Sequence, residues 1–228
     1  MRSLILPLVL ALLAAAPAYA DIQGRIRLAA SAPDPASVDM SSDPFCFRRS
    51  PHARAQSLRV SEGGLQDVFI HLVRPEAPPR PAPLTAAHLT ARDCTLQPRV
   101  LGVQAGQRVT LASEDQTLHA LRIHDAAGTQ DRRLPKAGMA FEHRFTRPQV
   151  MARITCDVHP WMQAFVGVVA HPYFAVTDET GRFQIPTEGL PDGRYPVALW
   201  HEVLGTRSAT VAVSGGEGRL ELTWDSAP

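Results

Sequence analysis

Three side chains that bind soft metal ions lie within seven residues of one another. Cys156, His159 and Met162 occur in the segment Ile154-Thr-Cys-Asp-Val-His-Pro-Trp-Met162, directly after one predicted strand and before another. Thiolate and thioether sulfur together with imidazole select copper, and two histidines with one cysteine and a weak axial methionine form a blue-copper site. The segment therefore predicts a mononuclear copper site that a second histidine completes.

The best candidate for that histidine is His119, which follows a predicted strand and a polar turn. His124, five residues later, is the rival upstream ligand. His71 is interpreted as a hydrogen-bonded core or edge residue, and His171 and His201 as structural residues or outer-shell partners of the metal. The remaining three are interpreted as solvated surface positions: His52, His88 and His143.

The first twenty residues have the pattern of an export signal. Arg2 is followed by an apolar run over residues 4–16, and Ala18-Tyr19-Ala20 has the small-x-small form that signal peptidase cleaves. No later segment approaches the ~20 apolar residues of a membrane span. We therefore expect residues 1–20 to be a signal peptide and the remainder to be a periplasmic protein.

The chain has three cysteines, an odd number for an oxidising compartment. Cys46 and Cys94 stand in ordinary polar surroundings, whereas Cys156 lies among histidine, tryptophan and methionine. This contrast predicts a Cys46–Cys94 disulfide and a free Cys156 available as a ligand. The alternative for Cys156 is an inert buried thiol, with His159 and Met162 as packing residues.

The composition fits a soluble globular protein and argues against two classes of function. Among 228 residues, 45% are hydrophobic and the formal net charge is +1, so no basic excess is present for nucleic acid. The sequence contains neither Gly-x-Ser-x-Gly nor His-Glu-x-x-His, and no convincing catalytic triad. We expect a protein that is not an enzyme.

Short apolar or alternating runs separated by Gly, Pro and Asp turns predict an all-β fold. No helix of three turns is expected, and the proline-rich stretch 74–84 is expected to be an exposed loop. The expected strands cover residues 22–28, 58–60, 68–73, 100–103, 108–113, 120–124, 141–145, 151–155, 165–170, 173–177, 182–186, 194–201, 208–213 and 219–224.

The motif set resembles that of cupredoxins. It comprises residues 106–110 (Gly-Gln-Arg-Val-Thr), Glu114-Asp115 with His119, and Cys156-x-x-His159 with Met162. Residues 63–205 are similar to exported cupredoxin-like proteins often labelled methylamine-utilisation proteins. The resemblance implies a Greek-key β-sandwich in which His119, Cys156, His159 and Met162 bind one type 1 copper ion.

One spacing departs from that of the small cupredoxins. Four residues usually separate the second histidine from the methionine there, whereas only Pro160 and Trp161 do so here. The shorter spacing resembles the copper loop of cytochrome oxidase, although that loop has a second cysteine that this chain lacks. Met162 is thus either the axial ligand or a core residue.

The C-terminal region resembles carboxypeptidase regulatory-like, transthyretin-type β modules. The similarity rests on Asp178-x-x-Gly181-x-Phe183 and Leu190-Pro191-x-Gly193-x-Tyr195, which supply turn and core residues. The expected organisation is a signal peptide over 1–20, a cupredoxin-like domain with an N-terminal β extension over 21–171, and a small β-sandwich module over 172–228.

These features together predict a monomeric periplasmic copper protein that transfers one electron at a time to or from a redox partner protein, whose identity the sequence does not specify. Two alternatives remain open. A copper carrier or storage protein would release its metal readily to a chelator, and a metal-free scaffold or adhesion protein would be purified without metal.

Overall fold

The computed structural model describes residues 20–29 and 32–225. The predicted signal peptide lies outside the described residues except for Ala20. Strands dominate the described chain, and its helix is the short α1 (Pro44–Arg49). Among the described residues, no helix has the length and hydrophobicity that a membrane crossing requires. The all-β fold predicted from the sequence is confirmed.

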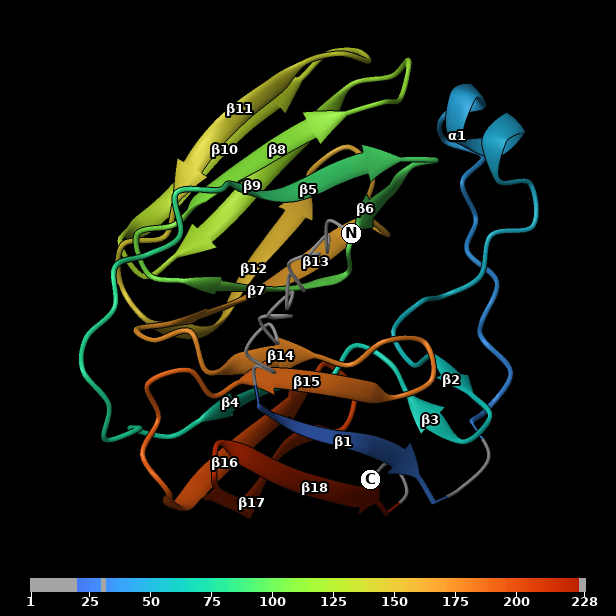
Figure 1. Cartoon of the computed structure of the whole chain (residues 1–228). Coiled ribbons are helices and arrows are strands. Elements are labelled where there is room, and N and C mark those ends of the chain that lie inside the picture. The colour runs from blue at the N-terminus through green and yellow to red at the C-terminus, as the bar shows by residue number, and fades with distance from the viewer. Residues whose placement is uncertain (1–19, 30–31, 226–228) are drawn as a thin grey trace, which may run out of the picture.

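A β-sandwich of two sheets forms the upper body of the molecule (Figure 1). In strand order, the five-stranded sheet contains β10 (Gly128–Leu134), β9 (His119–Asp125), β12 (Gln149–Cys156), β13 (Gln163–Val169) and β7 (Val100–Gln104). The four-stranded sheet contains β11 (Ala140–Arg144), β8 (Arg108–Ser113), β5 (Ala87–Arg92) and β6 (Thr95–Gln97).

Alternation of apolar and polar residues gives this sandwich its core. In β8, Val109, Leu111 and Ser113 are buried while the residues between them are not. In β9 the buried positions likewise begin with His119 and recur at every second residue, because successive side chains of a strand point to opposite faces. His119 at the start of β9 and Ser113 at the end of β8 therefore face the core of the sandwich.

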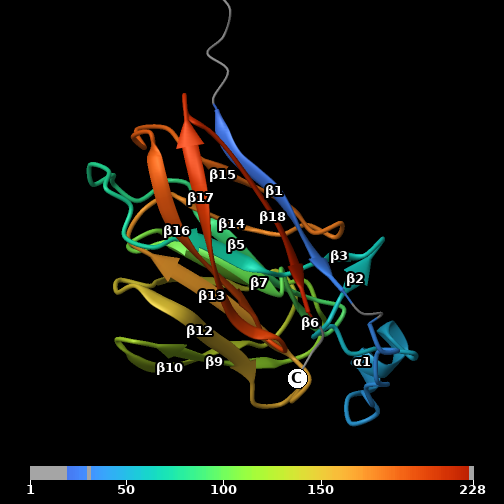
Figure 2. The same ribbon diagram turned by 90° about the horizontal axis from the view of Figure 1, so that it is seen from below.

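A nine-stranded sheet forms the second body (Figure 2). It consists of β14 (Phe174–Val176), β4 (Phe69–Leu72), β16 (Gly193–His201), β17 (Gly205–Ser214), β18 (Glu217–Trp224), β1 (Asp21–Leu28), β3 (Gly64–Leu65) and β2 (Val60–Ser61) in that order, with β15 (Arg182–Pro186) paired to β1. β1 runs parallel to β18. Strands from the first 72 residues and from the C-terminal region thus share one sheet, across the expected boundary at residue 172.

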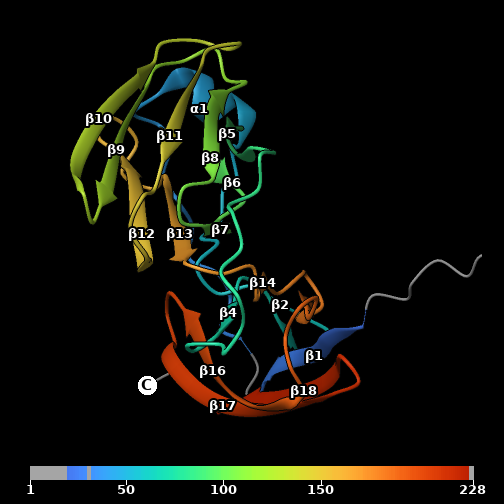
Figure 3. The same cartoon turned by 60° about the vertical axis from the view of Figure 1, so that its left-hand side comes forward.

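The two bodies, which Figure 3 shows one above the other, pack through aromatic side chains and a buried ion pair. A Cβ atom on Gly167 would come within 2.5 Å of the Phe69 ring, so the close approach of β13 to β4 requires glycine. Arg99, just before β7, forms a salt bridge with Glu202, just after β16. Both side chains are buried, and breaking such a pair costs about 3–5 kcal/mol.

Candidate metal centre

Two neighbouring strands bring His119 and Cys156 together. β9 begins at His119, and β12 ends at Cys156, which lies opposite Leu121 in the antiparallel pair. Leu121 and His119 are on the same face of β9, so the cysteine and the histidine project into the same end of the sandwich core. This pairing brings together two residues that are widely separated in the sequence.

The loop from β12 to β13 supplies the third donor. The Met162 amide donates to the His159 carbonyl at 2.9 Å, closing a four-residue turn with Pro160 in its second position, where the fixed φ of proline is favourable. The Cys156 amide in turn donates to the Met162 carbonyl at 3.2 Å. The short loop therefore folds back on itself and directs His159 toward Cys156.

Three donor atoms converge at this point. The Nδ1 atoms of His119 and His159 are 3.2 Å apart, and the Cys156 Sγ is 3.8 Å from the His159 Nδ1. All three side chains are buried. Bonds from a first-row metal ion to imidazole nitrogen and thiolate sulfur are about 2.0 and about 2.3 Å long, so one ion can span both separations. The donor set of two imidazoles and one thiolate fits copper.

The far nitrogen of His119 is held by Asp115. The His119 Nε2 donates to Asp115 Oδ2 at 3.0 Å, and the same carboxylate accepts the backbone N–H groups of Asp93 and Cys94. Asp93 and Cys94 both have positive φ and form the tight turn between β5 and β6. Asp115 therefore fixes the His119 ring and the turn that carries Cys94 at the same time.

The far nitrogen of His159 is held by a second carboxylate, Asp43. The His159 Nε2 donates to Asp43 Oδ2 at 3.0 Å, and the Thr117 hydroxyl donates to the same oxygen at 2.6 Å. The other oxygen, Oδ1, accepts the Phe45 and Cys46 amides and caps α1. Since an ionised carboxylate only accepts hydrogen bonds, each imidazole carries a proton on Nε2, and Nδ1 is the nitrogen that would bind a metal ion.

Burial and hydrogen bonds act in opposite directions on the pKa values of this cluster. Burial alone would lower the pKa of His119, but its hydrogen bonds with Asp115 and Cys156 raise it to about 9. Burial would raise the pKa of the Cys156 thiol, but hydrogen bonds from both histidines lower it to about 6. Metal-free Cys156 is therefore a thiolate at neutral pH, and the thiolate is the form that binds metals.

Met162 and Trp161 belong to the wall of the site. Met162 is buried in the same core cluster as Cys156, a position open to either role expected for it. The Trp161 indole donates to the Cys94 carbonyl at 3.0 Å and lies beside the His159 ring. Trp161 is thus held by packing and a hydrogen bond within the protein.

The other histidines lie away from the donor cluster. His124 is exposed on the outer face of β9, since it is an odd number of residues from His119. The expectation that His143 is a solvated surface residue is wrong: its side chain is buried and its Nε2 donates to Asp125 Oδ2 at 2.9 Å. His71 bonds to the Leu72 carbonyl, as a structural histidine does.

The cysteines pair as expected. Cys46 and Cys94 form a disulfide, and Cys156 is free and buried. The two carboxylates that hold the histidines, Asp43 and Asp115, could not be assigned this role from the sequence alone. Asp43-Pro44 is a readable helix start, with a capping residue followed by proline at the first helical position, but nothing in the sequence links it to His159. In the sequence, Asp115 stands out only as part of the cupredoxin-like motif.

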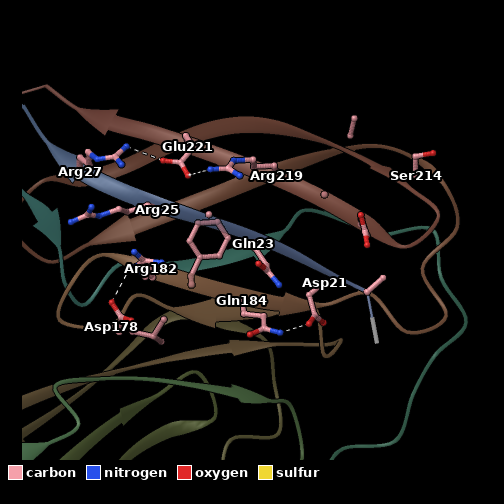
Figure 4. A pocket seen from close by; sticks show the side chains of 17 residues that line it. Asp21, Gln23, Arg25, Arg27, Asp178, Arg182, Gln184, Ser214, Arg219 and Glu221 are labelled. Carbon is pink, nitrogen blue, oxygen red and sulfur yellow. Dashed lines mark hydrogen bonds and ion pairs between the residues drawn. The ribbon is translucent and has the colours of Figure 1, made fainter. Parts of the chain in front are cut away.

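An open pocket elsewhere in the molecule is lined mainly by charged and polar side chains (Figure 4). It lies against β1, β15 and β18, and its described lining contains no histidine, cysteine or methionine. Arg27 and Arg219 both bind Glu221 there, so much of the charge is compensated locally. The candidate metal centre is instead a closed cluster inside the sandwich.

No protein-family profile and no curated protein matches the sequence. Solved structures similar to the chain include a purple cupredoxin from Nitrosopumilus maritimus, with 23% identity over 36% of this chain and 98% of that one at a TM-score of 0.31. An amicyanin from Paracoccus versutus shares 15% identity over 43% of this chain and 96% of its own, at a TM-score of 0.33. A copper-containing nitrite reductase from Thermus scotoductus shares 22% identity over 42% of this chain and 25% of its own, at a TM-score of 0.32.

Proposed function

We propose that the protein binds one copper ion through His119, Cys156 and His159 and transfers single electrons. The observation that carries this proposal is the convergence of two Nδ1 atoms and a buried thiol sulfur at one end of the sandwich. A ligand role accounts for a buried Cys156 with a lowered pKa beside two imidazole nitrogens.

Each residue has a distinct task in this proposal. Bound copper supplies a one-electron couple between Cu(II) and Cu(I). Cys156 provides the thiolate, whose lowered pKa removes the need for a separate base. His119 and His159 provide two nitrogens whose orientation is set by Asp115 and Asp43. Met162 would hold the ion weakly through its soft sulfur, which favours Cu(I).

The support around the donors favours electron transfer over copper carriage. A rigid site keeps nearly the same geometry in both oxidation states, so little reorganisation accompanies the electron. Here a disulfide, two hydrogen-bonded carboxylates and a turn closed by Pro160 fix the donors. A carrier would need ligands that open easily, whereas His119 and His159 are both buried.

The proposal extends to the location, assembly and partner of the protein. The protein is exported to the periplasm, acts as a monomer, exchanges electrons with a partner protein and is not an enzyme. We also propose that the protein is related to methylamine-utilisation proteins. Residues 172–228 would be related to carboxypeptidase regulatory-like β modules.

Copper analysis with absorption spectroscopy tests the function. The protein exported from a copper-supplied host should contain one copper ion per chain and show an intense visible thiolate-to-copper band that disappears on reduction. Stopped-flow mixing with a small inorganic redox reagent should show rapid electron exchange, while a chelator removes the metal slowly. Fast removal with slow electron exchange would favour a carrier, and a protein without copper would overturn the proposal.

A further inference from the structure

The segment around α1 covers the edge of His159. Asp43 reaches the His159 Nε2 at 3.0 Å, and the Cys46 Sγ lies 3.7 Å from the same nitrogen. The His159 side chain is consequently buried, although its loop lies at one end of the sandwich. A segment 113–116 residues upstream in the sequence therefore contacts the candidate ligand directly.

Several contacts hold Asp43 in this place. Its Oδ1 accepts the Phe45 amide at 2.7 Å, and its Oδ2 also accepts the Thr117 hydroxyl. The Cys46–Cys94 disulfide ties α1 to the turn between β5 and β6. Arg49 at the end of α1 adds a hydrogen-bonded ion pair with Asp93 in that turn, at 2.8 Å. The carboxylate thus meets the imidazole in one fixed orientation.

We propose that Asp43 is a positioning residue for the copper site, which acts through His159 to hold copper as Cu(II) and lower its reduction potential. This inference rests on the proposed function. A carboxylate that accepts the Nε2 proton fixes the tautomer in which Nδ1 has a free lone pair, and it makes the imidazole a stronger donor. Its negative charge favours the more positive oxidation state of the metal.

The Cys46–Cys94 disulfide holds Asp43 close to His159. It closes a loop of 48 residues and stabilises the fold by lowering the chain entropy of the unfolded state. Because Cys46 is only three residues from Asp43, the bond restricts how far the carboxylate can move from the imidazole. The tuning by Asp43 is thus a fixed property of the folded protein.

Three variants distinguish the positioning of His159 by Asp43 from the effect of a nearby negative charge and from an effect on folding. Asp43→Ser keeps a helix-capping side chain but loses the contact with His159. Asp43→Asn keeps the shape and removes the charge. Asp157→Asn is the matched control: Asp157 is next to Cys156 in the sequence, is exposed and pairs with Arg122, so it removes the same charge without touching an imidazole.

Voltammetry and copper competition on the loaded full chain give the main test. Both Asp43 variants should have a higher reduction potential than the parent and bind Cu(II) about tenfold to hundredfold more weakly, the usual effect of losing an outer-shell partner. Asp157→Asn should match the parent in both measurements. Parent-like potentials and affinities in both Asp43 variants would overturn the inference.

A measurement on metal-free protein keeps this inference separate from the proposed function. Nitrogen-15 NMR above the pKa of His159 should show the proton on Nε2 in the parent and a mixture of tautomers in Asp43→Ser. A parent protein that binds no copper would overturn the proposed function alone. An unchanged tautomer in Asp43→Ser would overturn the positioning role even if copper binds.

Discussion

His119 and His201 are two almost completely buried histidines, with exposed fractions of 0% and 1%, in the two bodies of the molecule. His119 has a carboxylate on one ring nitrogen and meets two further donors with the other. His201 accepts the Val203 and Leu204 amides with Nδ1, and its Nε2 has no hydrogen-bond partner among the described residues.

This difference in partners moves the two pKa values in opposite directions. Burial lowers the pKa of both rings, and at His201 the nearby Arg99 lowers it further, to about 4. At His119 the contacts with Asp115 and Cys156 outweigh burial, and the pKa rises to about 9. Burial alone therefore does not mark a histidine as a ligand; convergence with other donors does.

The largest expected effect comes from removing His119. His119→Ala should abolish the thiolate-to-copper absorption, because one of the three strong donors is gone. His201→Asn, equally buried, and His124→Ala, five residues from His119, should keep the band. Absorption spectra of the three copper-treated variants check this. A band that survives in His119→Ala but is lost in His124→Ala would show that the upstream ligand is misassigned.

The next effect is a loss of stability at mildly acidic pH caused by His201. Above pH 6.5, its ordinary value, the ring is neutral in both the folded and unfolded chains. Between pH 6.5 and about 4 only the unfolded chain takes up the proton, so the free energy of unfolding falls, by about 3 kcal/mol in total.

Urea unfolding of the parent and His201→Asn at several pH values measures how much His201 contributes to the pH dependence of the free energy of unfolding. The asparagine keeps a side-chain acceptor for the Val203 and Leu204 amides and does not titrate. The parent should lose more stability than the variant as the pH falls through this window. Parallel curves would contradict the account of His201.

The smallest effect concerns Met162, at the edge of the candidate centre. Met162→Leu should keep copper and its absorption while the reduction potential rises, because an apolar side chain disfavours the more charged oxidised state. Met162→Gln should lower the potential, because a harder oxygen ligand favours Cu(II). Voltammetry on both variants measures the shifts. Unchanged potentials in both would place Met162 in the core without contact to the metal.

Local patterning predicted most strands, and it failed where the pattern was weak. The apolar alternation of β8 and β15 predicted their bounds. β10 was missed because it is an edge strand whose sequence, GTQDRRL, is mostly exposed and has no apolar alternation. The pairing of β1 with β18 joins residues about two hundred positions apart, and no local pattern contains that information.

For the candidate site, too, the sequence predicted the residues that lie close together in the chain and not the contacts between distant segments. The spacing of Cys156, His159 and Met162 was visible in one loop, and the histidine, tryptophan and methionine around Cys156 predicted that the other two cysteines form the disulfide. His119 and His124 could not be separated with certainty until the strand face was known. Asp43 was unpredictable because its contact with His159 depends on how a distant capped helix packs against the sandwich.

X-ray absorption at the copper edge tests the central claim most directly, since it counts the atoms bound to the metal. We expect one short bond to sulfur and two bonds to imidazole nitrogen in the oxidised parent. The sulfur should disappear from the spectrum of Cys156→Ser, and one nitrogen from that of His119→Ala if metal is retained. A parent spectrum with only nitrogen and oxygen around copper would contradict the account.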